Sequence, residues 1–408
     1  MLGKHTDYAG GSSLTCAAES GLRARVDARE DGELALDDRS SDLRHHGPFP
    51  PQGESPPVDW TRYPWTFARR FARDFGAPSH GATVTWTSDL PQAAGLSSSS
   101  ALLIMLFLAL RETEGLDARE AYRRAIGTEL ALAAYLAALE SGRAFAHFEA
   151  DGGVGTRGGA GDHTAILCSR AHKLHLYSYD PHQLTRTIEM PTNCVFAIGV
   201  SGVAARKTGN AGALYGRATD LAAAAAGAWR HATGGDQEHL GAMLRSASAG
   251  EIRTVLEATD HGGFAGHELA RRFDHFALEQ GELLPGAVEA LGAGDLKQFG
   301  QVVDRSQAAA EALLGNQIPQ TSLLQREARS LGALAASAFG AGFGGAVWAL
   351  VEADKAAAFL ETWSNSYRNR YPDNARSARF LLTHAGGPAR VLDQEAVDSH
   401  ESFLNNPS

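Results

Sequence analysis

The sequence predicts an α+β protein made of two domains. The first half of the 408-residue chain mixes strand and helix patterns, and the run 82–87 alternates Ala, Val or Trp with Thr, as a strand does. The second half is mostly Ala-rich helical sequence from 208 to about 314. It closes with a glycine-rich turn that passes into the apolar strand pattern 346–352.

The predicted domain boundary lies at a buried strand. Residues 193–200 (Asn-Cys-Val-Phe-Ala-Ile-Gly-Val) are almost wholly apolar, which indicates a strand inside the core. A chain of this length has room for two ordinary domains. We therefore expect domains at 1–192 and 193–390, followed by a polar tail at 391–408.

The remaining elements follow from periodicity and composition. Apolar residues at helical spacing predict helices, whereas a segment rich in charge, Pro and Gly is typical of a surface loop. In chain order we expect a loop at 38–57, a helix at about 61–75, an apolar helix from Ala101, a helical pattern at 117–140, a strand at 164–169 and a helix at about 321–331.

Composition narrows the class of protein. Apolar residues make up 44% of the chain, charged residues 21%, and the formal charge is −10, which argues against a general nucleic-acid surface. The three cysteines are far apart, which suits free thiols in a reducing compartment. The start shows no secretory signal, and the longest apolar stretch, 101–110, is too short to span a bilayer. We expect a cytoplasmic monomer without a membrane or nucleic-acid partner.

The strongest chemical signal is the segment 91–100, Pro-Gln-Ala-Ala-Gly-Leu-Ser-Ser-Ser-Ser, between a predicted strand and a predicted helix. Glycine lets a backbone approach a polyanion closely, and N–H groups at a helix N-terminus form an anion site. A serine-rich N-cap is the alternative, but four serines exceed what one cap uses. The segment predicts a phosphate-binding loop that is not of the Walker A type. Its predicted phosphate-binding residues are Gly95, Leu96, Ser97, Ser98, Ser99 and Ser100.

Three other segments have patterns typical of ligand sites. The run 4–8, Lys-His-Thr-Asp-Tyr, offers polar groups for a polyhydroxylated ligand, or is an ordinary charged turn. Asp162 follows the glycine-rich run 158–161, where it can face a substrate hydroxyl or simply cap a turn. The glycine turn 340–345 fits equally well a tight turn packed beneath another loop.

In this order the segments resemble the galactokinase branch of the GHMP kinases. The run 5–11 (HTDYAGG) looks like the galactokinase signature, 95–103 (GLSSSSALL) like the superfamily phosphate loop and 339–345 (FGAGFGG) like its third motif. The likeness spans nearly the whole chain. It implies the two-domain GHMP kinase fold, with an N-terminal domain like ribosomal protein S5 domain 2 and a ferredoxin-like C-terminal domain. It also implies ATP on the serine loop and a sugar between the domains.

The resemblance further implies transfer of the γ-phosphoryl group of ATP to the C1 hydroxyl of a sugar, with galactose as the leading candidate. Serine and carboxylate oxygens suit Mg²⁺. By position, Asp162 faces the reacting hydroxyl, Ser99 and Glu140 bind Mg²⁺, and the sugar-binding residues are Lys4, His5, Asp7, Gly159 and Tyr215.

The chain departs from the family pattern in three places. Galactokinases carry an arginine upstream of the HTDY motif and a first strand, and we expect both to be missing because the chain starts at Met1. Lys4 stands where galactokinases usually have a glutamate, so the substrate could carry an acidic group, unless Lys4 points to solvent. His163 replaces the usual glutamine.

Two alternatives to an active galactokinase remain open from the sequence. One is a related sugar-1-kinase that acts on a uronic acid or arabinose. The other is a truncated galactokinase-like protein that binds ATP and sugar with little turnover, which the expected loss of the arginine favours.

Overall fold

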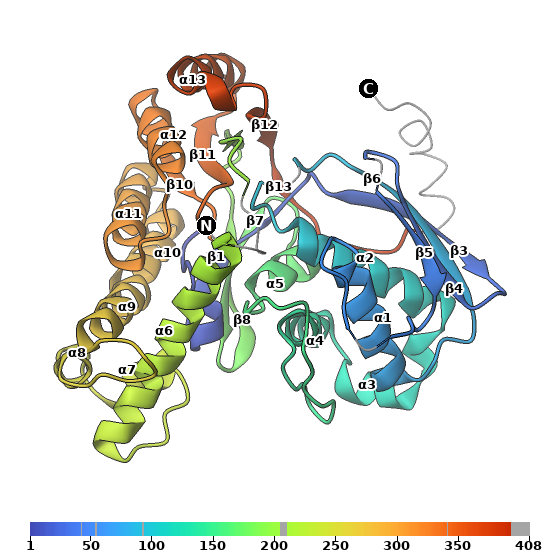
Figure 1. Ribbon diagram of the computed structural model, residues 1–408. Helices are drawn as coiled ribbons and strands as arrows, with labels where there is room; N and C mark the ends of the chain where they lie inside the picture. Colours follow the sequence, from blue (N-terminus) through green and yellow to red (C-terminus); the bar gives the residue numbers. More distant parts are fainter. Residues whose placement is uncertain (42, 54, 92–93, 205–209, 341, 393–408) are drawn as a thin grey trace.

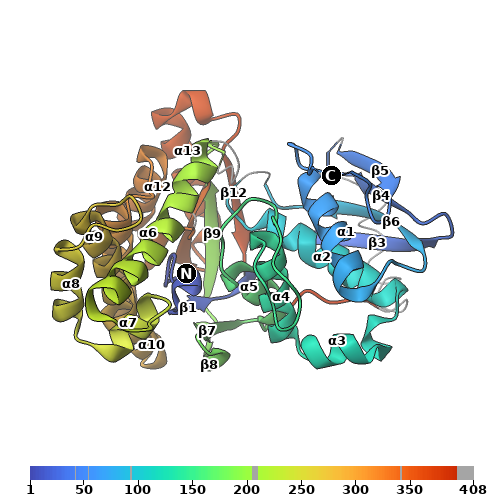
Figure 2. The ribbon, with the colours of Figure 1, turned by 60° about the horizontal axis from the view of Figure 1, so that its bottom comes forward.

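The computed structural model describes the whole chain except residues 42, 54, 92–93, 205–209, 341 and 393–408, and the side chains of 210–215. Two lobes flank a central layer of strands (Figure 1). The N-terminus lies in this central layer, beside elements from the C-terminal half, in both ribbon views (Figures 1 and 2). The predicted α+β class is confirmed.

The first lobe is a four-stranded sheet covered by helices. Its strands have the order β3-β6-β4-β5, with β4 parallel to β6 and the other pairs antiparallel. Helices α1, α2 and α4 pack together around buried Phe67, Phe71 and Phe107, of which the first two lie one helical turn apart. The bounds are β3 Leu22–Arg29, β4 Glu33–Asp38, β5 Arg44–Pro48, α1 Arg62–Phe75, β6 Gly81–Ser88, α2 Ser98–Thr113, η2 Leu116–Ala118, α3 Glu120–Ala125 and α4 Glu129–Ser141.

The central layer joins the start of the chain to its middle. The sheet has the order β1-β7-β8, and the short β2 pairs with β13 near the C-terminus. Helix α5 lies beside it and faces the first lobe (Figure 2). The bounds are η1 Asp7–Ala9, β1 Ser12–Thr15, β2 Ala17–Ala18, α5 Gly161–Cys168, β7 Lys173–Tyr179, β8 His182–Glu189 and β13 Ala385–Gly386.

The second lobe contains a sheet with ferredoxin-like connectivity. Strands β9 (Cys194–Val200), β10 (Ala335–Ala338), β11 (Ala346–Glu352) and β12 (Arg379–Thr383) have the order β10-β11-β9-β12, and all neighbours are antiparallel. Numbered within this lobe, the order reads 2-3-1-4, which is the split βαβ arrangement. Helices α12 and α13 pack on the sheet. This confirms the ferredoxin-like prediction.

A long helical insertion connects β9 to β10. These helices gather on the outer side of the second lobe (Figure 1). Their bounds, with α13, are α6 Asn210–Thr233, α7 Leu240–Ser246, α8 Ala249–Glu257, α9 Gly266–Leu278, η3 Glu279–Leu283, α10 Leu284–Gly292, α11 Leu296–Ala309, η4 Ala310–Leu314, α12 Pro319–Ser330, α13 Ala356–Arg370 and η5 Pro372–Asn374. None of the described helices is long and apolar enough to cross a membrane.

Three local predictions are wrong. Residues 164–169 are not a strand, because α5 covers Gly161–Cys168; a short apolar run has no period that separates strand from buried helix. The predicted loop 38–57 contains β5, which pairs with β4. The helical pattern 117–140 is broken into η2, α3 and α4, and the break is next to Gly127, whose low helix propensity permits it.

The core of the second lobe depends on Trp363. Its side chain is fully buried beneath β9, and its indole N–H donates to the carbonyl of Leu324, 3.1 Å away. We expect Trp363→Ala to lower the free energy of unfolding by about 3–5 kcal/mol, through the lost apolar area and the remaining cavity. Urea unfolding, monitored by circular dichroism, measures this change in the free energy of unfolding. The partly buried Trp65 provides the control, since Trp65→Ala should cost clearly less; equal losses would contradict the assignment.

Candidate active site

The serine loop turns sharply before it enters α2. Gly95 and Ser97 have left-handed backbone angles, with φ of 71° and 58°. Left-handed geometry at a non-glycine residue costs of order 1–3 kcal/mol and is concentrated at ligand sites. The Ser97 side chain makes no capping hydrogen bond to α2, so the N-cap alternative does not explain this serine. The backbone N–H groups in the first turn of α2 therefore receive no hydrogen bond from the Ser97 side chain.

Glu140 lies at the end of α4, beneath the serine loop. The hydroxyls of Ser99 and Ser100 each donate to a different oxygen of its carboxylate, at 3.3 Å. Nε2 of His163 lies 3.4 Å from the same carboxylate, and Glu140 is 5% exposed. Hydroxyl and carboxylate oxygens are ligands that Mg²⁺ accepts. The predicted pair, Ser99 and Glu140, is therefore brought together by two helices that are distant in sequence.

The N-terminal turn and the glycine run before α5 are packed against each other. Gly161 N–H donates to Oδ2 of Asp7 at 2.9 Å. A Cβ on Gly159 would lie 2.7 Å from the backbone nitrogen of Tyr8 and closer still to the Asp7 carboxylate. Burial raises the pKa of Asp7, and the hydrogen bond from Gly161 opposes this shift. This contact sets Asp162, in the first turn of α5, beside the HTDY turn.

Helix α11 and strand β10, from the C-terminal half of the chain, also contact this turn. Nζ of Lys4 donates to Oε1 of Gln307 at 2.9 Å and to Oγ of Ser337 at 2.7 Å. Lys4 is 3% exposed, so the interpretation that it points to solvent is wrong. Burial lowers the pKa of Lys4 to about 8, although the carboxylates of Glu279 and Glu311 act in the opposite direction.

His5 and Tyr8 are fixed by a buried arginine. Nδ1 of His5 lies 2.8 Å from the Tyr8 hydroxyl. Arg272, on α9, donates to the backbone carbonyl of His5 at 2.6 Å and to the Tyr8 hydroxyl at 3.4 Å. Sequence analysis missed Arg272, Gln307 and Ser337, because they lie in helices and a strand without any local motif.

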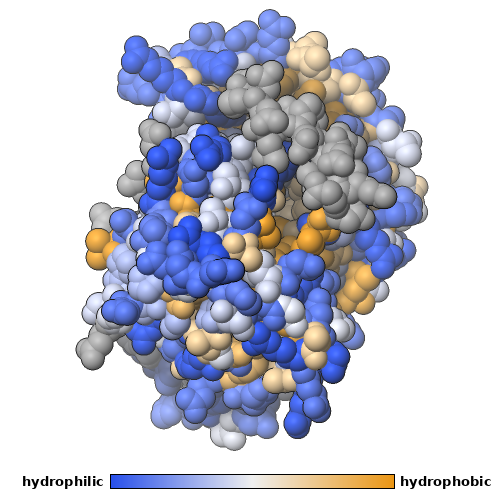
Figure 3. Space-filling model, turned by 90° about the vertical axis from the view of Figure 1, so that its right-hand side faces the viewer, coloured by the Kyte–Doolittle hydropathy of each residue, from blue (hydrophilic) through white to orange (hydrophobic). Residues whose placement is uncertain are grey.

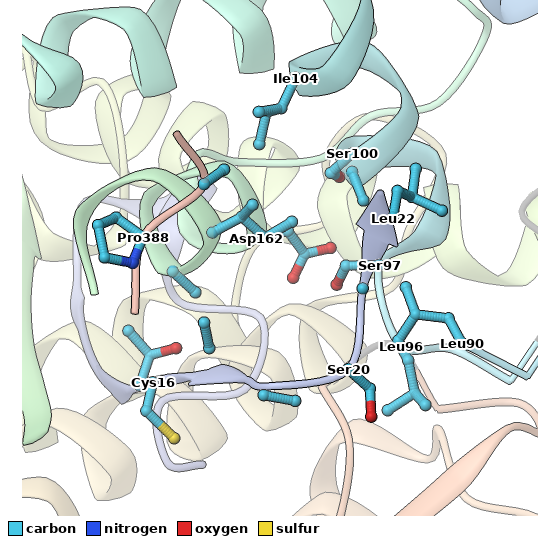
Figure 4. Close-up of a pocket in the computed structure, with 18 of the residues that line it drawn as sticks. Cys16, Ser20, Leu22, Leu90, Leu96, Ser97, Ser100, Ile104, Asp162 and Pro388 are labelled. Atoms are coloured by element: carbon cyan, nitrogen blue, oxygen red, sulfur yellow. The ribbon is translucent and has the colours of Figure 1, made fainter. Parts of the chain in front are cut away.

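A cavity of about 1540 Å³ unites most of the predicted residues. In Figure 4 the carboxylate of Asp162 points into it, on the side where Ser97 and Ser100 lie. One largely hydrophilic face of the molecule is hollowed near its centre, with hydrophobic residues at the rim (Figure 3). The predicted residues that line the cavity are Lys4, His5, Asp7, Leu96, Ser97, Ser100, Glu140, Gly159 and Asp162.

The other predicted site residues that the structure describes are not among those that line the cavity. Ser99 contacts Glu140 through its hydroxyl, whereas Ser98 is exposed at the start of α2. Gly95 shapes the turn through its positive φ. Tyr215 is on α6, but its side chain lies outside the described part of the structure. The roles of all these residues stay predictions.

Comparison with known proteins decides the family. The N-terminal domain model of the GHMP kinases matches residues 62–170, and the C-terminal model matches 287–369. Galactokinase from Streptomyces coelicolor is 28% identical over 365 residues, which cover 86% of this chain and 82% of the relative. The chain is a galactokinase-like GHMP kinase.

Two further similarities extend over nearly the whole kinase. The crystal structure of Lactococcus lactis galactokinase complexed with galactose has a TM-score of 0.77 at 20% identity, covering 96% of this chain and 92% of that one, which establishes the fold. Galacturonokinase from Arabidopsis thaliana is 24% identical over 416 residues, covering 96% of this chain and 91% of the relative.

The contact at Gly159 can be tested directly. We expect Gly159→Ala to lower the free energy of unfolding by about 1–3 kcal/mol, since its methyl group would overlap the Asp7 carboxylate and the Tyr8 backbone. Gly152→Ala is the matched control, because a Cβ there meets no atom within 4 Å. Chemical unfolding of both variants is the measurement, and equal stability would contradict the close packing.

Proposed function

We propose that this kinase transfers the γ-phosphoryl group of ATP to the C1 hydroxyl of a sugar, with galactose as the first candidate. One observation carries the proposal: a single cavity is lined by Asp162, the serine loop and the turn that contains His5 and Asp7. The family resemblance and the curated galactokinase relatives support it. The three described cysteines are free thiols, which supports a cytoplasmic location as part of the proposal. We also propose a monomer.

In this mechanism the chain mainly positions charged groups. The backbone N–H groups at the start of α2 would hold the phosphates of ATP. Ser99 and Glu140 would hold Mg²⁺, which neutralises charge on the phosphate oxygens when bound. A protonated His163, whose Nε2 lies 3.4 Å from the Glu140 carboxylate, would form an ion pair with it.

Asp162 would act on the acceptor side. From the first turn of α5 its carboxylate can accept a hydrogen bond from the C1 hydroxyl and take its proton as the oxygen attacks phosphorus. The 5–8 turn would hold the sugar's other hydroxyls, since it offers the imidazole of His5 and the carboxylate of Asp7. The buried hydrogen bonds beneath this turn keep it in place before substrate arrives.

Asp162 provides the primary test. In a coupled ADP-release assay with Mg·ATP and galactose, we expect Asp162→Asn to lower kcat by about 10²–10⁴-fold, the usual contribution of a positioned acid or base. Asp117→Asn, at an exposed position of η2, is the control and should retain activity. Turnover in Asp162→Asn equal to the unsubstituted enzyme would contradict the role. ATP binding without turnover on any sugar would instead favour the non-catalytic binding protein.

One observation favours a second substrate class. Lys4 places a buried cation in the wall of the same cavity, where two of its three donor positions are used by Gln307 and Ser337. A sugar with a carboxylate could accept from the third. The similarity to a galacturonokinase points to the same class. We therefore propose galacturonate, a uronic acid, as the alternative acceptor.

This alternative predicts a charge-dependent preference. We expect Lys4→Gln to lower kcat/KM for galacturonate relative to galactose by about 10- to 100-fold, the loss of one charge-assisted hydrogen bond. The exposed Lys297→Gln is the control. An unchanged ratio between the two sugars in Lys4→Gln would exclude the uronate contact.

The same lysine predicts a pH dependence. Its pKa is about 8 in the folded chain, below the usual 10.5, so kcat/KM for galacturonate should fall as pH rises through about 8, whereas that for galactose should not. Between pH 8 and 10.5 the unfolded chain binds this proton more strongly, so Lys4 makes the fold more stable as pH rises. A loss of stability caused by Lys4 therefore cannot explain the expected fall of kcat/KM for galacturonate at high pH. Parallel profiles for both sugars would contradict the prediction.

A further inference from the structure

A second, smaller cavity lies behind the sugar-binding turn. It has a volume of about 140 Å³ and shares no lining residue with the large cavity. Its walls come from α6, α9, the end of the η4 segment and the glycine turn that contains Phe343. Three of the residues that line it are arginines: Arg217, Arg271 and Arg272.

Arg272 is a buried cation whose hydrogen bonding is incomplete. It is 1% exposed, its Nε donates to the Ala218 carbonyl at 3.3 Å, and its NH2 group holds His5 and Tyr8. Its NH1 group is buried and has no hydrogen-bond partner. Within the described part of the chain, no carboxylate lies at ion-pair distance from this guanidinium. A buried, unpaired charge is strongly unfavourable, and an anion would compensate it.

The other charges around the cavity leave it positive. Arg217 forms an ion pair with Glu268, the one acidic residue among the described lining residues. Arg271 is exposed at its rim and forms no ion pair with any described residue. Several arginines lining one small cavity are typical of sites that bind phosphate through N–H donors.

The volume limits what can enter. A water molecule occupies about 30 Å³ of the liquid, and drug-sized ligands need about 300 Å³ or more. A cavity of about 140 Å³ therefore fits one tetrahedral oxyanion and is too small to hold a whole nucleotide. We propose that the Arg217–Arg271–Arg272 cavity binds a single phosphate group, either as inorganic phosphate or as the phosphoryl end of a sugar phosphate.

The experiment measures phosphate binding with the large cavity already filled. Inorganic phosphate is titrated into the full chain by isothermal titration calorimetry. The protein is first saturated with galactose and with the Mg²⁺ complex of a non-hydrolysable ATP analogue. A control titration with chloride at the same ionic strength corrects for non-specific effects of salt. We expect Arg271→Ala to raise the Kd for phosphate about tenfold or more, because one charge-assisted hydrogen bond is lost. Arg124→Ala, which removes an exposed arginine of α3, is the matched control and should leave the Kd unchanged.

A second titration distinguishes the two sources of the phosphate group. Galactose 1-phosphate that binds the same saturated protein, with the same sensitivity to Arg271→Ala, would identify a sugar phosphate as the ligand. Binding of inorganic phosphate alone would identify the free anion. Absence of phosphate binding to the saturated protein, or an equal loss in Arg271→Ala and Arg124→Ala, would overturn the proposal. Because Arg271 is outside the proposed catalytic machinery, these results do not depend on turnover.

Discussion

The hydrogen bond from Gly161 N–H to the Asp7 carboxylate is the contact on which the site depends. It joins the N-terminal turn to the first turn of α5 and so places Asp162 next to His5 and Asp7. No side chain fits at Gly159, which lets the two backbone segments approach. An acid positioned by backbone contacts on the end of a helix is held more rigidly than one on a free loop.

The turn is also held from the opposite side by the C-terminal half of the chain. Gln307 and Ser337 bind Lys4, and Arg272 binds the carbonyl of His5. The residues of the N-terminal signature are therefore part of an interface between regions separated by more than 250 positions in sequence. Such a buried polar network rigidifies a site when its members are satisfied. The NH1 group of Arg272 has no hydrogen-bond partner among the described residues, and Arg272 also lines the second cavity behind this turn.

The serine loop combines a strained backbone conformation with side-chain hydrogen bonds to a buried carboxylate. Ser97 adopts a left-handed conformation without capping α2, and the hydroxyls of Ser99 and Ser100 donate to Glu140. The carboxylate accepts from the two hydroxyls, and Nε2 of His163 lies 3.4 Å from it. Helices α2, α4 and α5 pack against one another here, so their packing determines the distance between the serine loop and Asp162.

The sequence by itself determined the fold class, the strong elements and the local motifs. Helix α1, strands β6 and β9, the serine loop and the Asp162 segment were all predictable because each carries its signal within about ten residues, as periodicity or as a glycine-rich turn. A short apolar run such as 164–169 has no decisive period, and there the prediction failed. Only the tertiary structure decided that Lys4 is buried, that Arg272 holds the turn containing His5 and Tyr8, and that a second cavity exists. The physical reason is that these features depend on contacts between distant segments, and their free energies come from burial and pairing that no local pattern records.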